Sequence, residues 1–141
     1  MINREDLIKD AKAALQNSYS PYSKFKVGAA VLTEDGKVYK GTNIENASYG
    51  LTCCAERVAI FSALTDTAPG EKKRKMAAIA IVIGGENAAD VPTESLSPCG
   101  ACRQVMSEFM DVDAPVFIEG TKDYTVGELL PYGFVLNEDA K

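Results

Sequence analysis

The chain has 141 residues, the length of a single domain, and its 46% hydrophobic and 25% charged residues are typical of a protein that buries a core. It contains no histidine, which excludes a Ser-His-Asp triad, a Cys-His nucleophile pair and any metal site built on imidazole. A net charge of −5 also disfavours a main role in binding DNA or RNA, whose phosphates attract basic surfaces.

The first part of the chain is predicted to form a helix and a β-hairpin. Residues 3–17 place apolar side chains at helical spacing, and Asn3 is a suitable N-cap. After an ordered connection over residues 18–23, two β-prone segments cover residues 25–32 and 38–43. An Asp-Gly turn separates the two segments, which predicts that they pair antiparallel.

The rest of the chain alternates helices and strands. Residues 76–84 are expected to form a central strand, because an apolar run without alternation is typical of a strand buried on both faces. The other predicted elements are helices over residues 53–64, 100–110 and 126–130 and a short strand over residues 116–118. This order predicts one α/β domain over residues 1–141, with helices on both faces of a mixed sheet. Ligands of such sheets bind where strands end and helices begin.

Two other segments bear on location and partners. No window approaches the roughly 18 consecutive apolar residues of a membrane span, and residues 1–10 are charged, without the apolar core of a signal peptide. We therefore expect a cytoplasmic protein with no membrane partner. The basic run Lys72-Lys73-Arg74-Lys75 is expected to be a solvated loop, the alternatives being a nuclear-localisation or phosphate-binding patch.

Two pairs of cysteines open two of the predicted helices. Cys53 and Cys54 form one pair, and Cys99 and Cys102 form the other. Cysteines of the cytoplasm serve more often as metal ligands or nucleophiles than as disulfides. The Cys-x-x-Cys spacing lets two sulfurs share one ligand, and the positive end of a helix favours the thiolate that zinc binds. The two pairs therefore predict a zinc site.

The number of ligands separates a catalytic from a structural zinc site. Three protein ligands and an open fourth position are typical of catalysis, whereas four ligands close a structural site. Adjacent residues on a helix point about 100° apart, so Cys53 and Cys54 are poorly placed to share one ion with the other pair. Three thiolates with an open position are therefore favoured over a closed site of four.

Charged residues beside the cysteines complete this hypothesis. Glu56 follows in the first helical turn, where it could lie next to zinc without binding it and take a proton from a zinc-activated water. Three thiolates and Zn²⁺ leave one net negative charge, which weakens zinc as a Lewis acid. Arg57 and Arg103 are expected to offset that charge by donating hydrogen bonds to the sulfurs.

The same residues carry a resemblance. Cys54-Ala55-Glu56 followed by Pro98-Cys99-x-x-Cys102 is similar to the signature of the zinc-dependent nucleoside deaminases. Further segments, over residues 25–30, 43–49, 99–105 and 129–134, resemble cytidine deaminases of the small, homotetrameric type with three zinc-binding cysteines. The resemblance extends from about Tyr19 to Phe134. It implies a three-layer α/β/α sandwich around a mixed, roughly five-stranded sheet.

The resemblance also implies a reaction. In such enzymes one zinc ion per subunit is held by the cysteines that match Cys54, Cys99 and Cys102, and a water molecule is the fourth ligand. The glutamate that matches Glu56 carries the proton of that water to N3 of cytosine. Hydroxide attacks C4, and ammonia leaves. The expected function is deamination of cytidine, and of deoxycytidine, in pyrimidine salvage.

The residues implied for substrate binding lie in several segments. Asn43 and Glu45 match a pair that grips the ribose 3′-hydroxyl, and Phe25 matches a residue that flanks the base. The backbone of Ala55 and the carbonyl of Ser97 match hydrogen-bond partners of the base and its amino group. A 3′-phosphate would meet the negative charge of Glu45, which favours a free nucleoside over nucleotides and nucleic acid.

The implied assembly is a homotetramer with active sites shared between subunits. Phe134 and Tyr49 match aromatic residues that approach the pocket of a neighbouring subunit. Three alternatives remain open: a blasticidin-S deaminase, which shares the zinc signature; a non-catalytic protein with a closed site of four cysteines; and a redox protein that uses Cys99 and Cys102.

Overall fold

The structure is a computed structural model that describes residues 2–92 and 95–136. Met1 and residues 137–141, the ends of the predicted domain, lie outside this range. The main helices are α1 (Arg4–Ala14), α2 (Ala55–Thr65), α3 (Gly100–Phe109) and α4 (Val126–Leu129), with short 3-10 helices at Leu15–Asn17, Tyr49–Leu51 and Ala88–Asp90. The strands are β1 (Lys26–Thr33), β2 (Val38–Thr42), β3 (Met76–Gly84), β4 (Pro115–Ile118) and β5 (Tyr124–Thr125).

The five strands form one mixed sheet in the order β2-β1-β3-β4-β5. β1 pairs antiparallel with both β2 and β3, β3 pairs parallel with β4, and β4 pairs antiparallel with β5. The predicted hairpin is confirmed, and Gly36 supplies the positive φ of 90° that its turn requires. The two-residue β5 was not predicted, because two residues carry no strand pattern.

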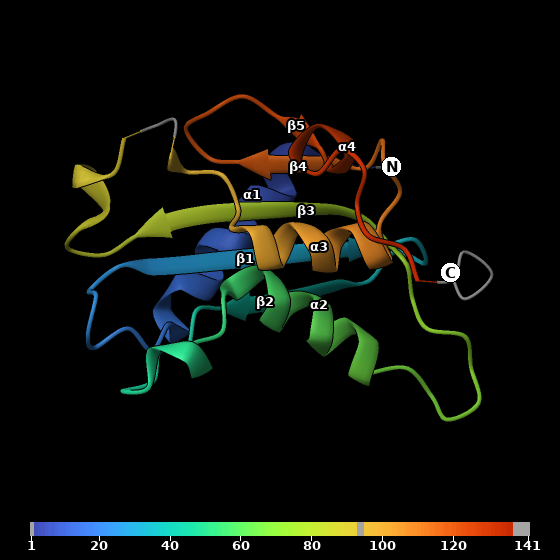
Figure 1. The fold of residues 1–141 in the computed structure, drawn as a ribbon, viewed down its shortest axis with the longest axis horizontal. Helices are drawn as coiled ribbons and strands as arrows, with labels where there is room; N and C mark the ends of the chain where they lie inside the picture. The colour runs from blue at the N-terminus through green and yellow to red at the C-terminus, as the bar shows by residue number, and fades with distance from the viewer. Residues whose placement is uncertain (1, 93–94, 137–141) are drawn as a thin grey trace.

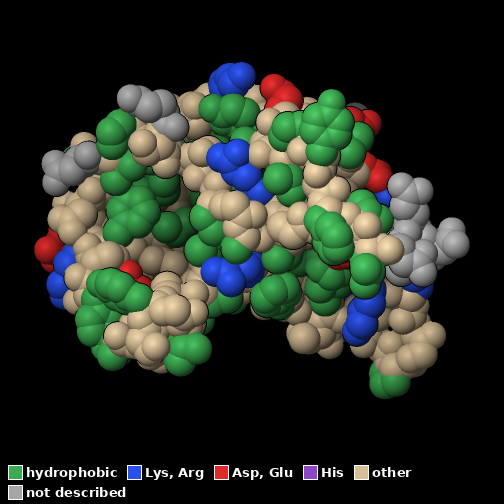
Figure 2. All heavy atoms as spheres, in the orientation of Figure 1, with side chains coloured by type: hydrophobic (Ala, Val, Ile, Leu, Met, Phe, Trp, Pro, Cys, Tyr) green, Lys and Arg blue, Asp and Glu red, His purple; other side chains and the backbone are tan. Residues whose placement is uncertain are grey.

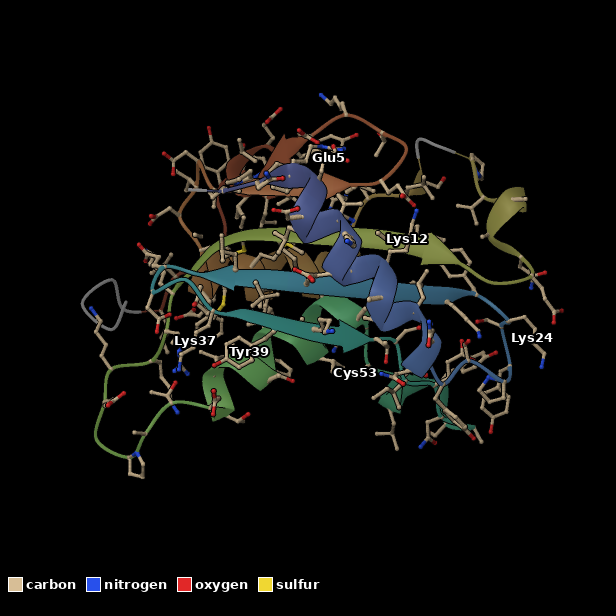
Figure 3. All side chains as sticks on the ribbon, turned by 180° about the vertical axis from the view of Figure 1, so that it is seen from behind. Glu5, Lys12, Lys24, Lys37, Tyr39 and Cys53 are labelled. Carbon is tan, nitrogen blue, oxygen red and sulfur yellow. The ribbon has the colours of Figure 1, made fainter. Side chains whose placement is uncertain are left out.

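Helices cover both faces of this sheet, which confirms the predicted three-layer architecture (Figures 1 and 3). α1 lies on one face, and α2 and α3 lie on the other. The central strand β3 supplies both cores: Ile79 and Ile81 pack on the side of α2 and α3, and Ala80 and Val82 pack on the side of α1. The alternation of side chains along a strand produces this division, and it explains why the whole segment is apolar.

Two glycines let the layers approach closely. A Cβ on Gly28 of β1 would lie 2.2 Å from the carbonyl oxygen of Ala11 in α1. A Cβ on Gly41 of β2 would lie 2.4 Å from the amide nitrogen of Ala59 in α2. Real Cβ atoms do not come so near to backbone, so glycine at these two positions sets how closely the helices pack on each face of the sheet.

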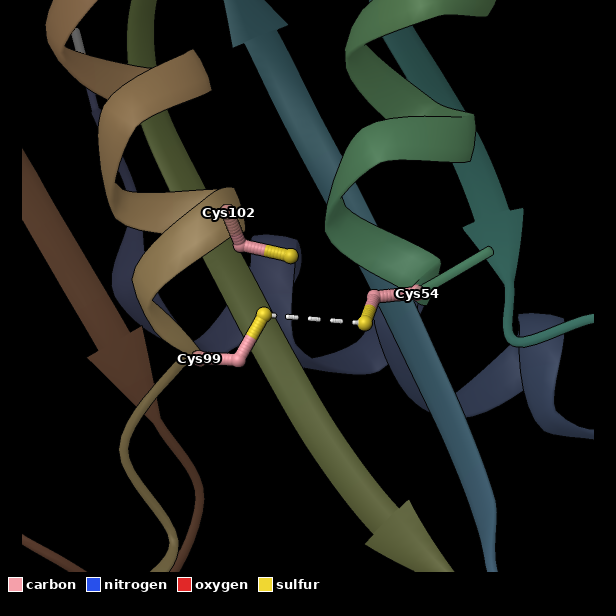
Figure 4. A group of neighbouring side chains, drawn as sticks. All are labelled: Cys54, Cys99 and Cys102. Carbon is pink, nitrogen blue, oxygen red and sulfur yellow. Dashed lines mark hydrogen bonds between the residues drawn. The ribbon is translucent and has the colours of Figure 1, made fainter. Parts of the chain in front are cut away.

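The start of α2 differs from the prediction. A helix from Cys53 was expected, but the helix begins at Ala55 with Cys54 as its N-cap. The reason is that Cys53 exchanges two backbone hydrogen bonds of 2.9 Å with Ile44 and is therefore extended. α3 begins after Cys99 in the same way, and the starts of the two helices lie side by side (Figure 4). No helix in the described part of the chain is long and apolar enough to cross a membrane.

Candidate metal centre and active site

Three cysteine sulfurs meet between the starts of α2 and α3 (Figure 4). The Sγ atoms of Cys54, Cys99 and Cys102 all lie within 4.8 Å of one another, and those of Cys54 and Cys99 are 3.8 Å apart. Tetrahedral thiolates at the usual Zn–S distance of about 2.3 Å are separated by about 3.8 Å. Cys102 is buried but Cys99 is exposed, so the cluster opens to the surface. The geometry fits one zinc ion with a position left for another ligand.

Cys53 does not belong to this cluster. Among the described residues, the group of three or more potential metal ligands consists of Cys54, Cys99 and Cys102. Both Cys53, paired with Ile44, and Cys54, with φ −74° and ψ 153°, are extended. Successive side chains of an extended backbone point to opposite sides. This geometry directs the side chain of Cys53 away from the three sulfurs, and it disfavours a closed site of four cysteines.

Arg57 supplies positive charge to the cluster. Its Nη2 donates to the Sγ of Cys54 at 3.4 Å, and its Nε is buried without a hydrogen-bond partner. The hydrogen bond from the Cys102 thiol, followed by that from Arg57, holds the pKa of the Cys54 thiol below its ordinary value, although burial opposes this. A lowered thiol pKa and a spare guanidinium N–H both suit a group of metal-bound thiolates.

Arg103 acts differently from the prediction. It was expected to donate to the zinc ligands, but its guanidinium donates to the carbonyl oxygens of Pro98 at 2.7 Å and Leu129 at 2.8 Å. Its Nη2 also donates to the Oγ of Ser97 at 2.8 Å. Arg103 therefore ties the loop before Cys99 to the end of α4. The prediction rested on the nearness of Arg103 to the cysteines in sequence and on the negative charge of the thiolates, and neither determines the direction of its side chain.

Glu56 lies in the first turn of α2 with only 5% of its surface exposed. Burial raises the pKa of its carboxyl group, and the negative charge of Cys54 adds to this effect. Hydrogen bonds from the backbone of Glu56 and from the Cys102 side chain act in the opposite direction without cancelling the rise. A carboxyl group with a raised pKa beside a metal position is suited to accept and return a proton.

A second polar cluster surrounds Asn43 and Glu45, which are both 8% exposed. The Oδ1 of Asn43 accepts hydrogen bonds from the amide of Val27 at 2.9 Å and from the hydroxyl of Ser18, and its Nδ2 donates to the carbonyl of Phe25 at 2.7 Å. Hydrogen bonds to Glu45 hold the pKa of its carboxyl group below the ordinary value although burial, the largest single influence, raises it. Glu45 is therefore a fixed anion.

Comparisons with known proteins identify the family. The sequence model of the cytidine and deoxycytidylate deaminase zinc-binding region matches residues 1–118. A cytidine deaminase of Halalkalibacterium halodurans is 45% identical over 141 residues, covering 97% of this chain and 98% of that one. The chain belongs to the cytidine deaminase family. Zinc is therefore its cofactor, and the three clustered sulfurs suit one such ion.

Two further relatives extend the comparison within the cytidine deaminase family and its neighbours. The crystal structure of a cytidine deaminase from Burkholderia pseudomallei superposes with a TM-score of 0.76 at 47% identity, covering 94% of this chain and 100% of that one. A blasticidin-S deaminase from Bacillus cereus is 31% identical over 118 residues, covering 82% of this chain and 81% of that one. The fold is that of the cytidine deaminases.

The other residues predicted from the resemblance to cytidine deaminases occupy different environments. Ala55, the first residue of α2, is fully buried, whereas Phe25 and Ser97 are half-buried. Tyr49 and Phe134 are 65% and 67% exposed. The two aromatic residues thus lie on the surface of the single chain, unlike the zinc ligands.

Sequence analysis missed three residues that hold the predicted ones. Ser18 donates to Asn43, Ser23 donates to Glu45, and the side chain of Gln104 both accepts from and donates to the backbone of Phe134, at 3.2 and 2.9 Å. Ser18 and Ser23 lie in the connection that was predicted to be ordered, but a serine in a connecting segment carries no signal of its partner. These pairings appear only in the folded structure.

Proposed function

We propose that this chain is a cytidine deaminase that converts cytidine and deoxycytidine to the corresponding uridines and ammonia, in pyrimidine salvage in the cytoplasm. One zinc ion per subunit is held by Cys54, Cys99 and Cys102. The observation that carries the proposal is the meeting of three sulfurs at tetrahedral spacing with the buried carboxyl group of Glu56, in a chain without histidine. Zinc bound by three thiolates supplies a Lewis acid that makes water a nucleophile at neutral pH.

The protein groups then manage the protons and the base. Glu56 takes one proton from the attacking water and delivers it to N3 of cytosine. It then takes the second proton of that water, from the hydroxyl group now on C4, and transfers it to the departing amino group, which leaves a carbonyl at C4. The C4–N4 bond breaks, a C4–O bond replaces it, and ammonia leaves. The backbone of Ala55 and the carbonyl of Ser97 hold the base and its amino group, and Arg103 supports this by fixing the loop at Ser97. Arg57 offsets the negative charge of the thiolates.

The sugar is bound by Asn43 and Glu45, with Phe25 beside the base. An amide that donates and a carboxylate that accepts can together satisfy one 3′-hydroxyl. The fixed negative charge of Glu45 repels a 3′-phosphate. A free nucleoside is therefore the substrate, rather than a nucleotide or nucleic acid, in agreement with the net charge of −5.

The active enzyme is a homotetramer in which neighbouring subunits complete each site. Large apolar side chains gather at several places on the face that carries α2 and α3 (Figure 2). Besides Tyr49 and Phe134, the exposed ones include Leu51 at 71% and Leu136 at 88%. Side chains of this kind are costly to leave in water, which supports contacts between copies of the chain through Tyr49 and Phe134.

The experiment is an assay of the zinc-loaded protein with cytidine and deoxycytidine. Loss of the cytosine absorbance should match ammonia release, while cytidine 3′-monophosphate and blasticidin S should react far more slowly. Absence of turnover with both nucleosides overturns the proposal, and faster turnover of blasticidin S replaces it with the alternative substrate. X-ray absorption should find three sulfur neighbours and one oxygen around zinc. Four sulfur neighbours would favour the non-catalytic, closed zinc site of four cysteines. A disulfide between Cys99 and Cys102 after mild oxidation of the zinc-loaded protein would favour the redox alternative.

A further inference from the structure

We propose that Ser23 is a positioning residue for sugar recognition, which acts by fixing the carboxylate of Glu45. This inference rests on the proposed function, because it takes the 3′-hydroxyl of the nucleoside as the partner of Glu45. Ser23 lies outside the motifs that carry the resemblance, in the turn that precedes β1. It does not itself touch the reacting atoms.

Residues 22 and 23 together bind both oxygens of the Glu45 carboxylate. The amides of Tyr22 and Ser23 donate to Oε1 at 3.0 and 3.1 Å. The hydroxyl of Ser23 donates to Oε2. Because Glu45 is 8% exposed, water has little access to replace any of these donors. Hydrogen bonds to a charged acceptor are stronger than those between neutral groups, so this turn determines the orientation of the carboxylate.

The direction of the Ser23 hydroxyl is itself constrained. Its oxygen accepts a hydrogen bond from the amide of Phe25 at 3.0 Å. A serine hydroxyl has one proton to donate, and with the oxygen engaged by Phe25 that proton is directed to Glu45. The same hydroxyl thus connects the start of β1 with the carboxylate.

The backbone of the turn is held in place as well. Lys24 has a φ of 58°, in the left-handed region that non-glycine residues rarely adopt. Its amide donates to the carbonyl of Ser20 at 3.1 Å, and Asn87 donates from its side chain to the carbonyl of Ser23 at 2.5 Å. The change of backbone direction at Lys24 lets Ser23 face Glu45, while Phe25, the following residue, leads into β1. A strained conformation of this kind persists only where the surrounding structure supports it.

The test compares two substrates that differ in the group that Glu45 is proposed to bind. With deoxycytidine, Ser23→Ala should lower kcat/KM about ten-fold, the effect of losing one hydrogen bond to a charged group. With 2′,3′-dideoxycytidine, which lacks the 3′-hydroxyl, the same variant should stay within about two-fold of the parent. Ser23→Thr keeps the hydroxyl and should restore most of the loss. Ser62→Ala removes a hydroxyl that donates to the carbonyl of Val58 within α2, and it should leave kcat/KM for both substrates unchanged.

Several results would overturn the inference or separate it from the proposed function. Equal losses with both substrates, or no loss with deoxycytidine, would mean that Ser23 does not act through the sugar. If Glu45→Gln likewise loses kcat/KM equally with both substrates, or loses none with deoxycytidine, the assignment of Glu45 to the 3′-hydroxyl is wrong. If the parent turns over neither substrate, the proposed function itself fails. If Ser23→Ala does not fold, as judged by zinc content and thermal unfolding, Ser23→Cys replaces it. This variant nearly keeps the side-chain volume but has a weak donor, and it should lose kcat/KM with deoxycytidine and not with 2′,3′-dideoxycytidine.

Discussion

The two adjacent cysteines differ because of the backbone that holds them. Cys53 pairs with Ile44 in an extended conformation, and Cys54 is the N-cap of α2. In sequence the two are equivalent thiols at the start of a helix, and a fully helical geometry would have placed them about 100° apart. The extended geometry turns them to opposite sides, so that Cys54 alone faces the other two sulfurs.

This difference predicts unequal effects of removing each thiol. Cys53→Ser should retain the zinc content and the turnover of the parent, whereas Cys54→Ser should lose most of its zinc because one of three thiolates is gone. Metal analysis of the purified variants measures the zinc bound per chain. Loss of zinc in Cys53→Ser, or full zinc in Cys54→Ser, would contradict the assignment.

The buried carboxylate of Glu45 predicts a dependence of stability on pH. Its pKa in the folded protein lies below the ordinary value of 4.5, so the charged form stabilises the fold above that value. This contribution is lost as the pH falls through the lowered folded pKa. The free energy of unfolding of the parent minus that of Glu45→Gln should therefore decrease between pH 6 and pH 3. A difference that is constant or grows in acid would show that the carboxylate is not held as an anion.

The site was predictable as far as local spacing could specify it. Cys54, Glu56, Cys99 and Cys102 lie at helix starts, where a few residues of spacing determine which side chains can share a ligand. The partner of Arg103 was not predictable, because its acceptors at Pro98 and Leu129 come from two segments that only the tertiary fold brings together.

At the scale of the elements, the closeness of α2 to the sheet affects where one zinc ligand, Cys54, lies. Gly41 lets the backbone of α2 lie against β2. The contact is with the first turn of the helix, which directly follows Cys54. Gly28 does the same for α1 on the opposite face, which carries no proposed site residue. The two glycines therefore provide a matched pair of sites for the same substitution.

Gly41→Ala should weaken zinc binding as well as stability, because α2 must move away from the sheet and take Cys54 with it. Gly28→Ala should destabilise the fold by a similar amount, about 1–3 kcal/mol, and affect zinc affinity less. Competition with a chromophoric chelator measures the affinity, and denaturant unfolding measures the stability. Equal losses of zinc affinity in both variants would contradict this account.

The basic run contacts the C-terminal end of α2. Lys73 donates to the carbonyl of Leu64 at 3.1 Å, and Arg74 donates to those of Ala63 and Asp66 at 3.2 and 2.7 Å. These carbonyls lie at the C-terminal end of the helix, which positive charge stabilises. The run was expected to be a solvated loop; it does lie in a loop, but three of its side chains are engaged, since Lys75 also pairs with Asp111.

Arg74→Gln should destabilise the protein, because the Arg74 side chain is only 13% exposed and satisfies two carbonyls at the end of α2. The expected loss in free energy of unfolding is about 1–3 kcal/mol. Lys72→Gln, on an exposed neighbour, is the control and should change stability by less than about 0.5 kcal/mol. Urea unfolding at one protein concentration makes the comparison, and equal effects of the two substitutions would refute it.

Most elements were predictable because their patterns are local. The amphipathic α1, the Asp-Gly hairpin and the uniformly apolar β3 each carry their signal within a few residues. What the sequence could not specify depends on distant partners. β5 exists because Thr125 and Tyr124 pair with Pro115 and Val116, and α2 begins late because of Ile44.

At the scale of the whole molecule, the single chain leaves large apolar side chains exposed. Phe134 is held at the surface by the side chain of Gln104, which bonds both its amide and its carbonyl. The proposed tetramer would bury these exposed residues, since a side chain fixed at the surface of one subunit can enter the pocket of a second copy. Assembly and catalysis would then be inseparable.

A mixing experiment tests whether subunits share active sites. Glu56→Gln should be inactive and Phe134→Ala weakened, because each lacks one part of the proposed site. When the two are unfolded and refolded together with zinc, some sites should combine an intact Glu56 with an intact Phe134 of another subunit, and activity should exceed the sum of the separate variants. Activity equal to that sum would contradict shared sites.

The central claim is that Glu56 moves the protons of a zinc-dependent deamination. The most direct test is the turnover of cytidine by zinc-loaded parent and Glu56→Gln, followed by loss of the cytosine absorbance and by ammonia release. The parent should release one ammonia per cytidine consumed, and Glu56→Gln should be slower by about 10²–10⁴-fold with its zinc content unchanged. No turnover by the parent, or equal turnover by the variant, would contradict the account.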